Sequence, residues 1–457
     1  MRNWLPSYRP TQATPAPRAR ILKASPPAVL AMGFLALIGA GTLLLWLPVS
    51  QREPFGLFPA FFTATSAVTV TGLSIIDPGT QLTAFGQLVL MMLIQLGGLG
   101  FVTFAVISAI TLGKRLSLHQ QALALQVFDQ TSVTKIQSTA FGILKLSLFV
   151  ELLAGACLAV WWSRDMPWPQ AAFQATFHTV SAFNNAGFAL YADSLGRFTT
   201  DGVSLVIICL CIISGGLGFT VINELWRKRA WAGLLPYTKI ILAVTAALNV
   251  LGLILFWWLE HNNPATLAAL SPGDGLLNAW FYSVTSRTAG FATLDITAFH
   301  DSTTLLIMVL MFIGGASLST AGGIKIGTCV VLLSAAWSFV RHRPEVVLFR
   351  RSVSPDTVQK ALALLLVTVF MMLGGVFIIL VIEQERVPFL DVLFEVISAL
   401  ATTGLTRNTT AILSEPSQAV LTLLMFAGRL GPLTLVYSIA TQKRSRIRYP
   451  EAEFQVG

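Results

Sequence analysis

Four short segments, each ending in glycine, combine small, hydroxyl and amide residues in a pattern suited to holding a dehydrated cation. They read TVTG at 69–72, FNNAG at 183–187, SRTAG at 286–290 and ATTG at 401–404. Glycine tolerates backbone angles that other residues resist, so a segment ending in glycine can turn its carbonyl oxygens towards one point. Rings of such carbonyls replace the water shell of a cation in selective channels. The candidate cation ligands are Val70, Thr71, Gly72, Asn185, Ala186, Gly187, Thr288, Ala289, Gly290, Thr402, Thr403 and Gly404.

A glycine-rich stretch, GGASLSTAGGIKIG at 314–327, interrupts a long apolar segment. Each glycine disfavours helix by about 1 kcal/mol relative to alanine, so this stretch is expected to form a flexible loop that obstructs the path below the four segments. Arg429 lies alone in another apolar run, where an arginine is costly and faces the protein interior or a cavity. We expect it to donate hydrogen bonds to the loop and to repel cations; a kinked helix packed on small residues is the alternative for the loop. The candidate gate residues are Gly314, Gly315, Ser317, Ser319, Thr320, Gly322, Gly323, Lys325 and Arg429.

The spacing of the four glycines indicates an internal repeat. Gly72, Gly187, Gly290 and Gly404 are separated by 115, 103 and 114 residues, and small-residue sites beginning at Gly97, Gly215, Gly314 and Gly428 follow them. One such segment alone would be an ordinary turn, but long-period similarity indicates a repeated supersecondary unit. Each unit is expected to consist of a helix, a half-helix that leads into one of the four glycine segments, and a second helix. The half-helices are expected at 59–66, 168–181, 275–285 and 388–399, and GGLG at 97–100 and 215–218 is expected to allow close helix packing.

The composition places these elements in a membrane. Hydrophobic residues make up 54% of the chain and charged residues 11%, and the mean hydropathy is +0.72. A bilayer core takes about 20 apolar residues as helix, and non-helical backbone is tolerated there only inside protein or a water-filled cavity. The expected fold is an all-α membrane protein with eight transmembrane helices and four re-entrant half-helices, arranged as four pseudo-symmetric repeats around a central pore. The expected divisions are a tail at 1–27, repeats at 28–112, 136–226, 236–340 and 356–440, and a tail at 441–457.

The charge pattern predicts the orientation. The net charge is +9, and most basic residues fall in the N-terminal tail, the C-terminal tail and the links after each second helix. Most acidic residues fall on the opposite side, together with the four segments. Because cytoplasmic links are enriched in lysine and arginine, both termini are expected in the cytoplasm. The basic residues thus report topology, no nucleic-acid binding is expected, and the basic links would contact membrane lipid or an acidic protein surface.

Taken together, the four glycine segments, the interruption at 314–327 and Arg429 resemble the Trk/Ktr/HKT superfamily of potassium transporters over residues 28–440. The short N-terminal tail is most similar to that of the membrane subunit of bacterial Ktr systems. The resemblance implies K⁺ as the substrate held in the filter, Na⁺ as an activator, no cofactor in this chain, and a place in the bacterial plasma membrane. It also implies a homodimer regulated by a cytoplasmic ring of nucleotide-binding RCK subunits. The SLST at 317–320 departs from the family pattern, where glycine often follows the serine.

Two other classes of protein were weighed. A coupled secondary transporter with broken helices is the alternative, although such proteins generally show two related halves rather than four units. A membrane enzyme is not expected, because the histidines are scattered and no HExxH, GxSxG or paired-carboxylate spacing is present. No role is assigned to Lys145 and Glu151, which lie six residues apart in an apolar helix and therefore on different faces.

Overall fold

The computed structural model describes residues 26–100, 133–349 and 351–431 of the 457-residue chain. This part is helical, as predicted, apart from one small antiparallel hairpin of β1 (Val347–Leu348) and β2 (Arg351–Ser352). The tails predicted at 1–27 and 441–457 lie outside the described residues except for 26 and 27.

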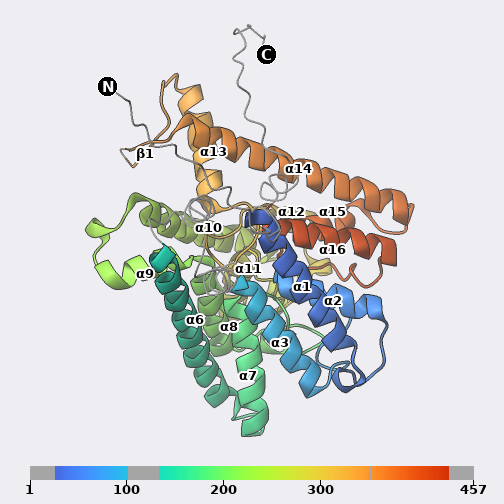
Figure 1. Ribbon diagram of the computed structural model, residues 1–457. Coiled ribbons are helices and arrows are strands. Elements are labelled where there is room, and N and C mark those ends of the chain that lie inside the picture. Colours follow the sequence, from blue (N-terminus) through green and yellow to red (C-terminus); the bar gives the residue numbers. More distant parts are fainter. Residues whose placement is uncertain (1–25, 101–132, 350, 432–457) are drawn as a thin grey trace, which may run out of the picture.

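Ten helices of the described part form the frame of the molecule (Figure 1). They are α1 (Pro26–Trp46), α3 (Ala84–Gly98), α6 (Val133–Trp162), α8 (Gly202–Gly216), α9 (Phe219–Lys228), α10 (Pro236–Glu260), α12 (Asp301–Phe312), α13 (Ile326–Val340), α14 (Pro355–Glu383) and α16 (Glu415–Leu430). The links contain the 3-10 helices η1 (Pro48–Ser50), η2 (Gly196–Phe198), η3 (Trp231–Gly233), η4 (Leu267–Ala269) and η5 (Ile296–Ala298). In the described part, α6, α10 and α14 are each long and apolar enough to cross a membrane, and the bent pair α8 and α9 makes a fourth if it is one span. The chain is therefore a membrane protein, while the count of eight spans stays a prediction.

Four helices of 12 to 16 residues, called the short helices below, pack against this frame. They are α2 (Leu57–Thr69), α7 (Trp168–Phe183), α11 (Pro272–Thr285) and α15 (Phe389–Leu400). Each contains one of the half-helices expected from the sequence or overlaps it almost fully. Proline occupies the N-cap of α7 and α15 and the first turn of α11, where its missing N–H leaves no donor unsatisfied. The sequence therefore predicts their beginnings well.

The packing of the four short helices follows a closed circular order. Along the chain, α2 contacts α1 and α3, α7 contacts α6 and α8, α11 contacts α10, and α15 contacts α14 and α16. Across the molecule, α2 contacts α16, α7 contacts α3, α11 contacts α8, and α15 contacts α12. The last helix group thus touches the first, so the four short helices surround one shared interior region.

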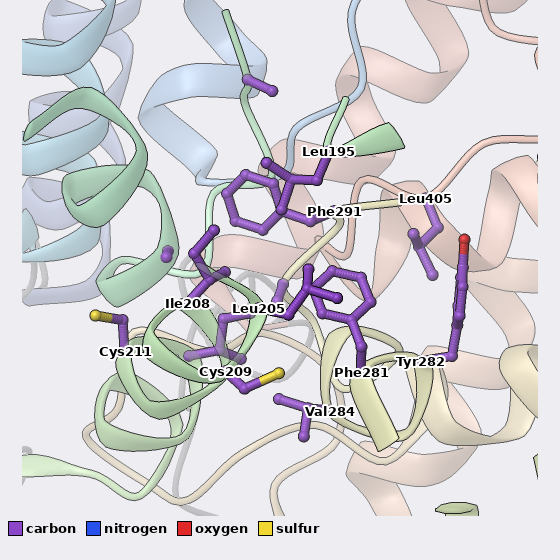
Figure 2. Close-up of a cluster of buried hydrophobic side chains, with 14 of the residues drawn as sticks. Leu195, Leu205, Ile208, Cys209, Cys211, Phe281, Tyr282, Val284, Phe291 and Leu405 are labelled. Atoms are coloured by element: carbon purple, nitrogen blue, oxygen red, sulfur yellow. The ribbon is translucent and has the colours of Figure 1, made fainter. Parts of the chain in front are cut away.

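Apolar side chains hold the short helices against the frame. Figure 2 shows Leu205, Ile208 and Cys209 of α8 beside Phe281 and Val284 of α11, in one buried cluster. In a bilayer, where lipid tails are as apolar as these side chains, close van der Waals packing rather than removal from water stabilises such contacts. This packing fixes where the C-terminal ends of the short helices point.

Two frame helices are broken. The break between α12 and α13 leaves 313–325 non-helical, and it coincides with the predicted interruption at 314–327. The second break falls in the GGLG at 215–218, which was expected only to allow close helix packing: α8 and α9 meet there at 98°, around Leu217 and Gly218. Gly218 has a φ of +84°, which a residue with a side chain rarely adopts. At the break Gly218 lies close to Ser317 of the non-helical segment 313–325. A continuous helix would use the backbone groups near Gly218 in its own hydrogen bonds, whereas the break leaves them available to that segment.

The small-residue sites let α3, α8 and α16 each approach the short helix that precedes it in the chain. A Cβ built on Gly97, Gly215 or Gly428 would collide with the backbone of Val68, Phe183 or Leu400 respectively. Each of these three partners lies four residues before the glycine of its segment. In the third group Gly314 instead faces Gly322 of the loop. The same packing thus recurs three times and is replaced where the helix is broken.

Candidate cation-binding ring and the loop beneath it

The short helices end in a shared backbone pattern. At the end of α2, Val70 N donates to Ala67 O at 3.1 Å and Thr71 N donates to Ser66 O at 2.8 Å. The same two bonds end α7 and α15, whereas α11 ends in a variant of the pattern. This is the Schellman arrangement, whose left-handed residue is usually glycine. Here the left-handed residues, two before the glycine of each segment, are Val70, Asn185, Thr288 and Thr402, with φ between 49° and 70°.

These four residues store backbone strain. For residues with a Cβ the left-handed conformation costs about 1–2 kcal/mol, and β-branched residues such as Val70, Thr288 and Thr402 are genuine outliers there. Such strain persists only where the surrounding structure enforces it, and it concentrates at functional sites. The same left-handed residue thus recurs at one position in all four segments, two before the glycine.

The four glycines form a closed ring. Gly72, Gly187, Gly290 and Gly404 have φ values of +98°, +69°, +83° and +90°. A Cβ built on any of them would lie closer than 3.0 Å to a carbonyl oxygen of the next segment, and these oxygens belong in order to Ala186, Ala289, Thr403 and Thr71. The fourth glycine thus faces the first segment. Of the twelve predicted ligand residues, eleven are buried and Gly72 is partly exposed.

Hydroxyl groups support the ring from the short helices. Ser66 Oγ accepts a hydrogen bond from Gly72 N at 3.0 Å, and Ser398 Oγ accepts one from Gly404 N at 3.1 Å. Thr285 Oγ1 donates to Phe291 O at 2.8 Å. The sequence analysis did not indicate Ser66 and Ser398. Their signal was present, since both precede a ring glycine by six residues.

A buried carboxylate supports the second segment. Glu151 in α6 accepts hydrogen bonds from Gln95 Nε2 at 3.0 Å, Ser147 Oγ at 2.8 Å and Asn184 Nδ2 at 3.3 Å. Asn184 also donates to Gln95 Oε1 at 2.7 Å. The side chains of α3 and α6 therefore hold the residue that precedes Asn185. The sequence gave Glu151 no role, although a lone carboxylate in an apolar helix is itself a signal of function.

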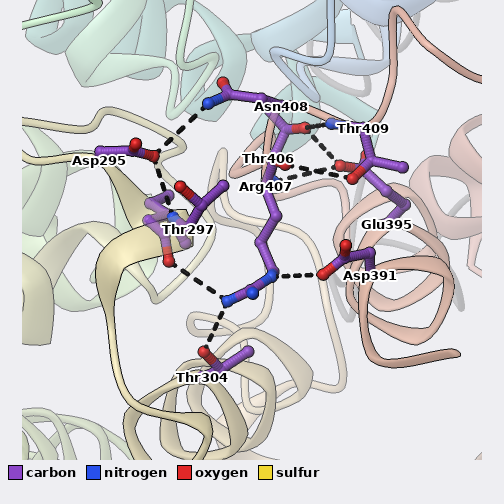
Figure 3. A network of polar contacts seen from close by, with 10 residues as sticks. Asp295, Thr297, Thr304, Asp391, Glu395, Thr406, Arg407, Asn408 and Thr409 are labelled. Carbon is purple, nitrogen blue, oxygen red and sulfur yellow. Dashed lines mark hydrogen bonds and ion pairs between the residues drawn. The ribbon is translucent and has the colours of Figure 1, made fainter. Parts of the chain in front are cut away.

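An ion-pair network joins the third and fourth groups (Figure 3). Arg407 Nε lies 2.6 Å from Asp391 Oδ1, and Arg407 Nη1 donates to Thr304 Oγ1 at 3.0 Å. Glu395 accepts from Thr406 and, at 2.7 Å, from Thr410. The sequence does not indicate this role for Arg407, because Thr304 lies 103 residues earlier in the chain. The network fixes the segment that follows Gly404.

The loop between α12 and α13 docks on the broken end of α8. Ala316 N donates to Gly216 O at 3.0 Å, and Thr320 N donates to Gly215 O at 3.3 Å. In return, Phe219 N donates to Leu318 O at 3.3 Å. The break between α8 and α9 thus frees the carbonyl and amide groups that hold the loop.

Two cationic side chains also hold this loop. Arg429 Nη1 donates to Thr320 O at 2.5 Å, as expected, and its Nη2 donates to Gly97 O at 2.9 Å and Gly98 O at 3.1 Å. Lys325 Nζ donates to Ala321 O at 2.5 Å. The contacts of Arg429 with α3 were not foreseen. Arg429 therefore ties the loop to the end of α3.

The loop lies against the ring. A Cβ built on Gly322 would meet Thr402 and the backbone of Ala401, and Thr320 Oγ1 donates to Phe183 O at 3.0 Å. Ser319 Oγ closes a turn on Ala316 O at 2.6 Å. The structure thus brings the candidate gate residues directly beside the second and fourth ring segments. Across the described residues, no group of three or more His, Cys, Asp or Glu side chains is placed to hold a metal ion.

Known proteins match the chain along nearly its whole length. The family described as "TrkH: Cation transport protein" matches residues 21–231 and 228–446. The Ktr system potassium uptake protein B of Bacillus subtilis (strain 168) is 40% identical over 433 residues, covering 95% of this chain and 97% of that protein. The protein of the same name from Vibrio alginolyticus is 40% identical over 431 residues, covering 94% of each.

Solved structures agree on the fold. The potassium transporter TrkH from Vibrio parahaemolyticus matches with a TM-score of 0.73 at 20% sequence identity, covering 93% of this chain and 87% of that one. The likeness at this identity concerns the fold alone. With the family match and the two relatives, it places the chain in a known group. The chain belongs to the TrkH family of cation transport proteins.

Proposed function

We propose that this protein conducts K⁺ into the cell across the plasma membrane through the ring of four glycine segments. The closed ring of Gly72, Gly187, Gly290 and Gly404 is the observation that carries the proposal. Each short helix directs its C-terminal end, the negative end of its dipole, at the ring, which favours a cation there. Relatives named as potassium uptake proteins support K⁺ as the substrate.

The loop at 314–327 is proposed as the gate. It lies against the ring, and Arg429 and Lys325 place two cationic groups beside it. A K⁺ ion leaving the ring would meet both the loop and this positive charge. Opening then requires the loop to leave its hydrogen bonds with Gly215, Gly216 and Arg429.

Regulation is proposed to come from outside this chain. The sequence contains no nucleotide-binding fingerprint, and the relatives are named as parts of a Ktr system. We also propose that the protein forms a homodimer, that a cytoplasmic ring of nucleotide-binding RCK subunits regulates it, and that Na⁺ activates it. The orientation, with both termini in the cytoplasm of a bacterial cell, follows the charge pattern.

A coupled secondary cation transporter is the second candidate. The breaks between α8 and α9 and between α12 and α13 favour it, because discontinuous helices form the binding sites of many such transporters. Liposomes containing the purified protein separate the two. A channel-like pathway passes ⁸⁶Rb⁺ down a K⁺ gradient alone, whereas a coupled transporter requires a second ion gradient. Flux that depends strictly on a second gradient would reject the channel proposal.

A further inference from the structure

A cavity of about 450 Å³ opens between α10, α13, the β1–β2 hairpin and the start of α14. Figure 1 shows β1 beside α13, next to the beginning of α14. The volume falls in the range of about 300–1,000 Å³ that is typical of small-molecule sites. Nothing in the ring or in its supporting networks uses this cavity, and one of its walls is Ser317 of the loop.

The cavity wall changes from cationic to apolar along α14. Thr357, Lys360, Ala361 and Leu364 line it at the spacing of one helix face. Thr357 and Lys360 thus lie nearer the start of the helix, Ala361 directly follows Lys360, and Leu364 lies one turn further along. Arg351 of β2 adds a second cation at the start. Apolar residues of α10 and α13, including Val331, line the remaining walls.

Among the residues that the structure describes, the charged side chains that line the cavity are Arg351 and Lys360. No described carboxylate lies within 4.0 Å of either, and Asp356, four residues before Lys360 in the first turn of α14, does not line the cavity. The N-terminal end of α14 adds the positive end of a helix dipole at the same place. The cavity therefore offers positive potential at one end and apolar surface at the other.

We propose that this cavity binds an anionic phospholipid. The phosphate would lie between Arg351 and Lys360, and the start of an acyl chain would run along Val331 and Leu364. Basic pockets between transmembrane helices on the cytoplasmic side are suited to anionic headgroups. A soluble anion would satisfy the cations and leave the apolar walls unused. The chain's own tail at 441–457 is a poor occupant of the cavity, because its four basic side chains outnumber its two acidic ones and would be repelled by Arg351 and Lys360.

Binding here would act on the loop at 314–327, a consequence that rests on the proposed function. Tyr237 Oη accepts a hydrogen bond from Ser317 N at 3.1 Å, and both residues line the cavity. An occupant therefore contacts the loop and the side chain that holds it. Anionic lipid is expected to change the rate of ion flux rather than the ion preference, because the ring lies beyond the loop.

Native mass spectrometry of the full-length protein tests the site without reference to transport. Phosphatidylglycerol is the probe, phosphatidylcholine the neutral comparison, and the double variant Arg351→Gln/Lys360→Gln removes both cations. Each lysine or arginine near an anionic lipid contributes about 1 kcal/mol, or about fivefold in affinity. The double variant should therefore bind phosphatidylglycerol about thirtyfold more weakly. Arg343→Gln is the matched control, since Arg343 is exposed nearby and does not line the cavity.

Flux of ⁸⁶Rb⁺ in vesicles of the two lipids completes the test. Wild type and Arg343→Gln should respond to phosphatidylglycerol, and the double variant should not. Equal lipid adducts in the double variant and the wild type, or equal binding of both lipids, would overturn the site. A response to inorganic phosphate in phosphatidylcholine vesicles equal to that of phosphatidylglycerol would overturn the lipid as its ligand. Normal adducts without any ion flux would count against the proposed function while leaving the site intact.

Discussion

Replacing Gly72 by serine should damage ion selection at the ring. Gly72 has a φ of +98°, and a Cβ at this position would lie closer than 3.0 Å to the carbonyl oxygen of Ala186. The left-handed conformation costs a residue with a side chain about 1–2 kcal/mol, and overpacking a tight site costs about 1–3 kcal/mol. The backbone of the first or the second segment must therefore move.

That movement should appear in the preference for K⁺ over Na⁺. The local cost sums to about 2–5 kcal/mol, and a share of only about 1.4 kcal/mol falling on K⁺ binding changes the affinity tenfold. Selectivity depends on the number and field strength of the coordinating carbonyls. We therefore expect Gly72→Ser to lower the K⁺/Na⁺ preference at least about tenfold.

The assay is ⁸⁶Rb⁺ uptake into liposomes, with K⁺ and Na⁺ as competitors over a range of concentrations. The ratio of the two half-inhibiting concentrations gives the preference. Gly39→Ser is the matched control, because a Cβ on Gly39 of α1 would meet no atom within 4 Å. An unchanged ratio in folded Gly72→Ser protein would refute the assignment of this segment to the ring.

Three further substitutions test the surrounding contacts. Arg429→Gln removes charge and hydrogen bonds to the loop, so maximal ⁸⁶Rb⁺ flux should rise severalfold while the apparent K⁺ affinity changes little; an unchanged maximal rate would reduce the loop to a packing element. Glu151→Leu should destabilise the protein by about 1–3 kcal/mol, because buried donors lose their acceptor; thermal unfolding should show a much smaller effect for Glu151→Gln, and equal effects would contradict the stated hydrogen-bond role. Arg407→Met should cost about 1–3 kcal/mol, because Asp391 and Thr304 lose a charged donor in a partly buried network, whereas Lys228→Met, in a more exposed pair, should cost less than about 1 kcal/mol. Equal shifts in the unfolding temperature of these last two variants would contradict the account of the Arg407 network.

The elements near the ring could be predicted because their signals are local. Proline and cap residues mark the beginnings of α7, α11 and α15, and the glycine of each segment marks the turn that follows. The resemblance to the Trk and Ktr transporters is confirmed by the family match, which also bears out the expectation of a transporter rather than an enzyme.

The contacts that support the ring could not be predicted in the same way. Asn184 is separated from Gln95 by 89 residues, and Arg429 from Gly97 by 332. Such pairs depend on the circular packing order of the helices, which no local pattern encodes. The bend at Gly218 was missed for a similar reason, because GGLG permits either close packing or a break. The docking of the distant loop at Ala316 and Leu318 decides between them.

Locating a bound ion would show whether the four glycine segments bind the transported cation. Crystals of the full-length protein grown with Rb⁺ or Tl⁺ give an anomalous signal that identifies the cation without reliance on its coordination. We expect an anomalous difference peak enclosed by the segments that end in Gly72, Gly187, Gly290 and Gly404, and a weaker peak there when Na⁺ competes. A strong peak elsewhere in the protein, with none inside this ring, would contradict it.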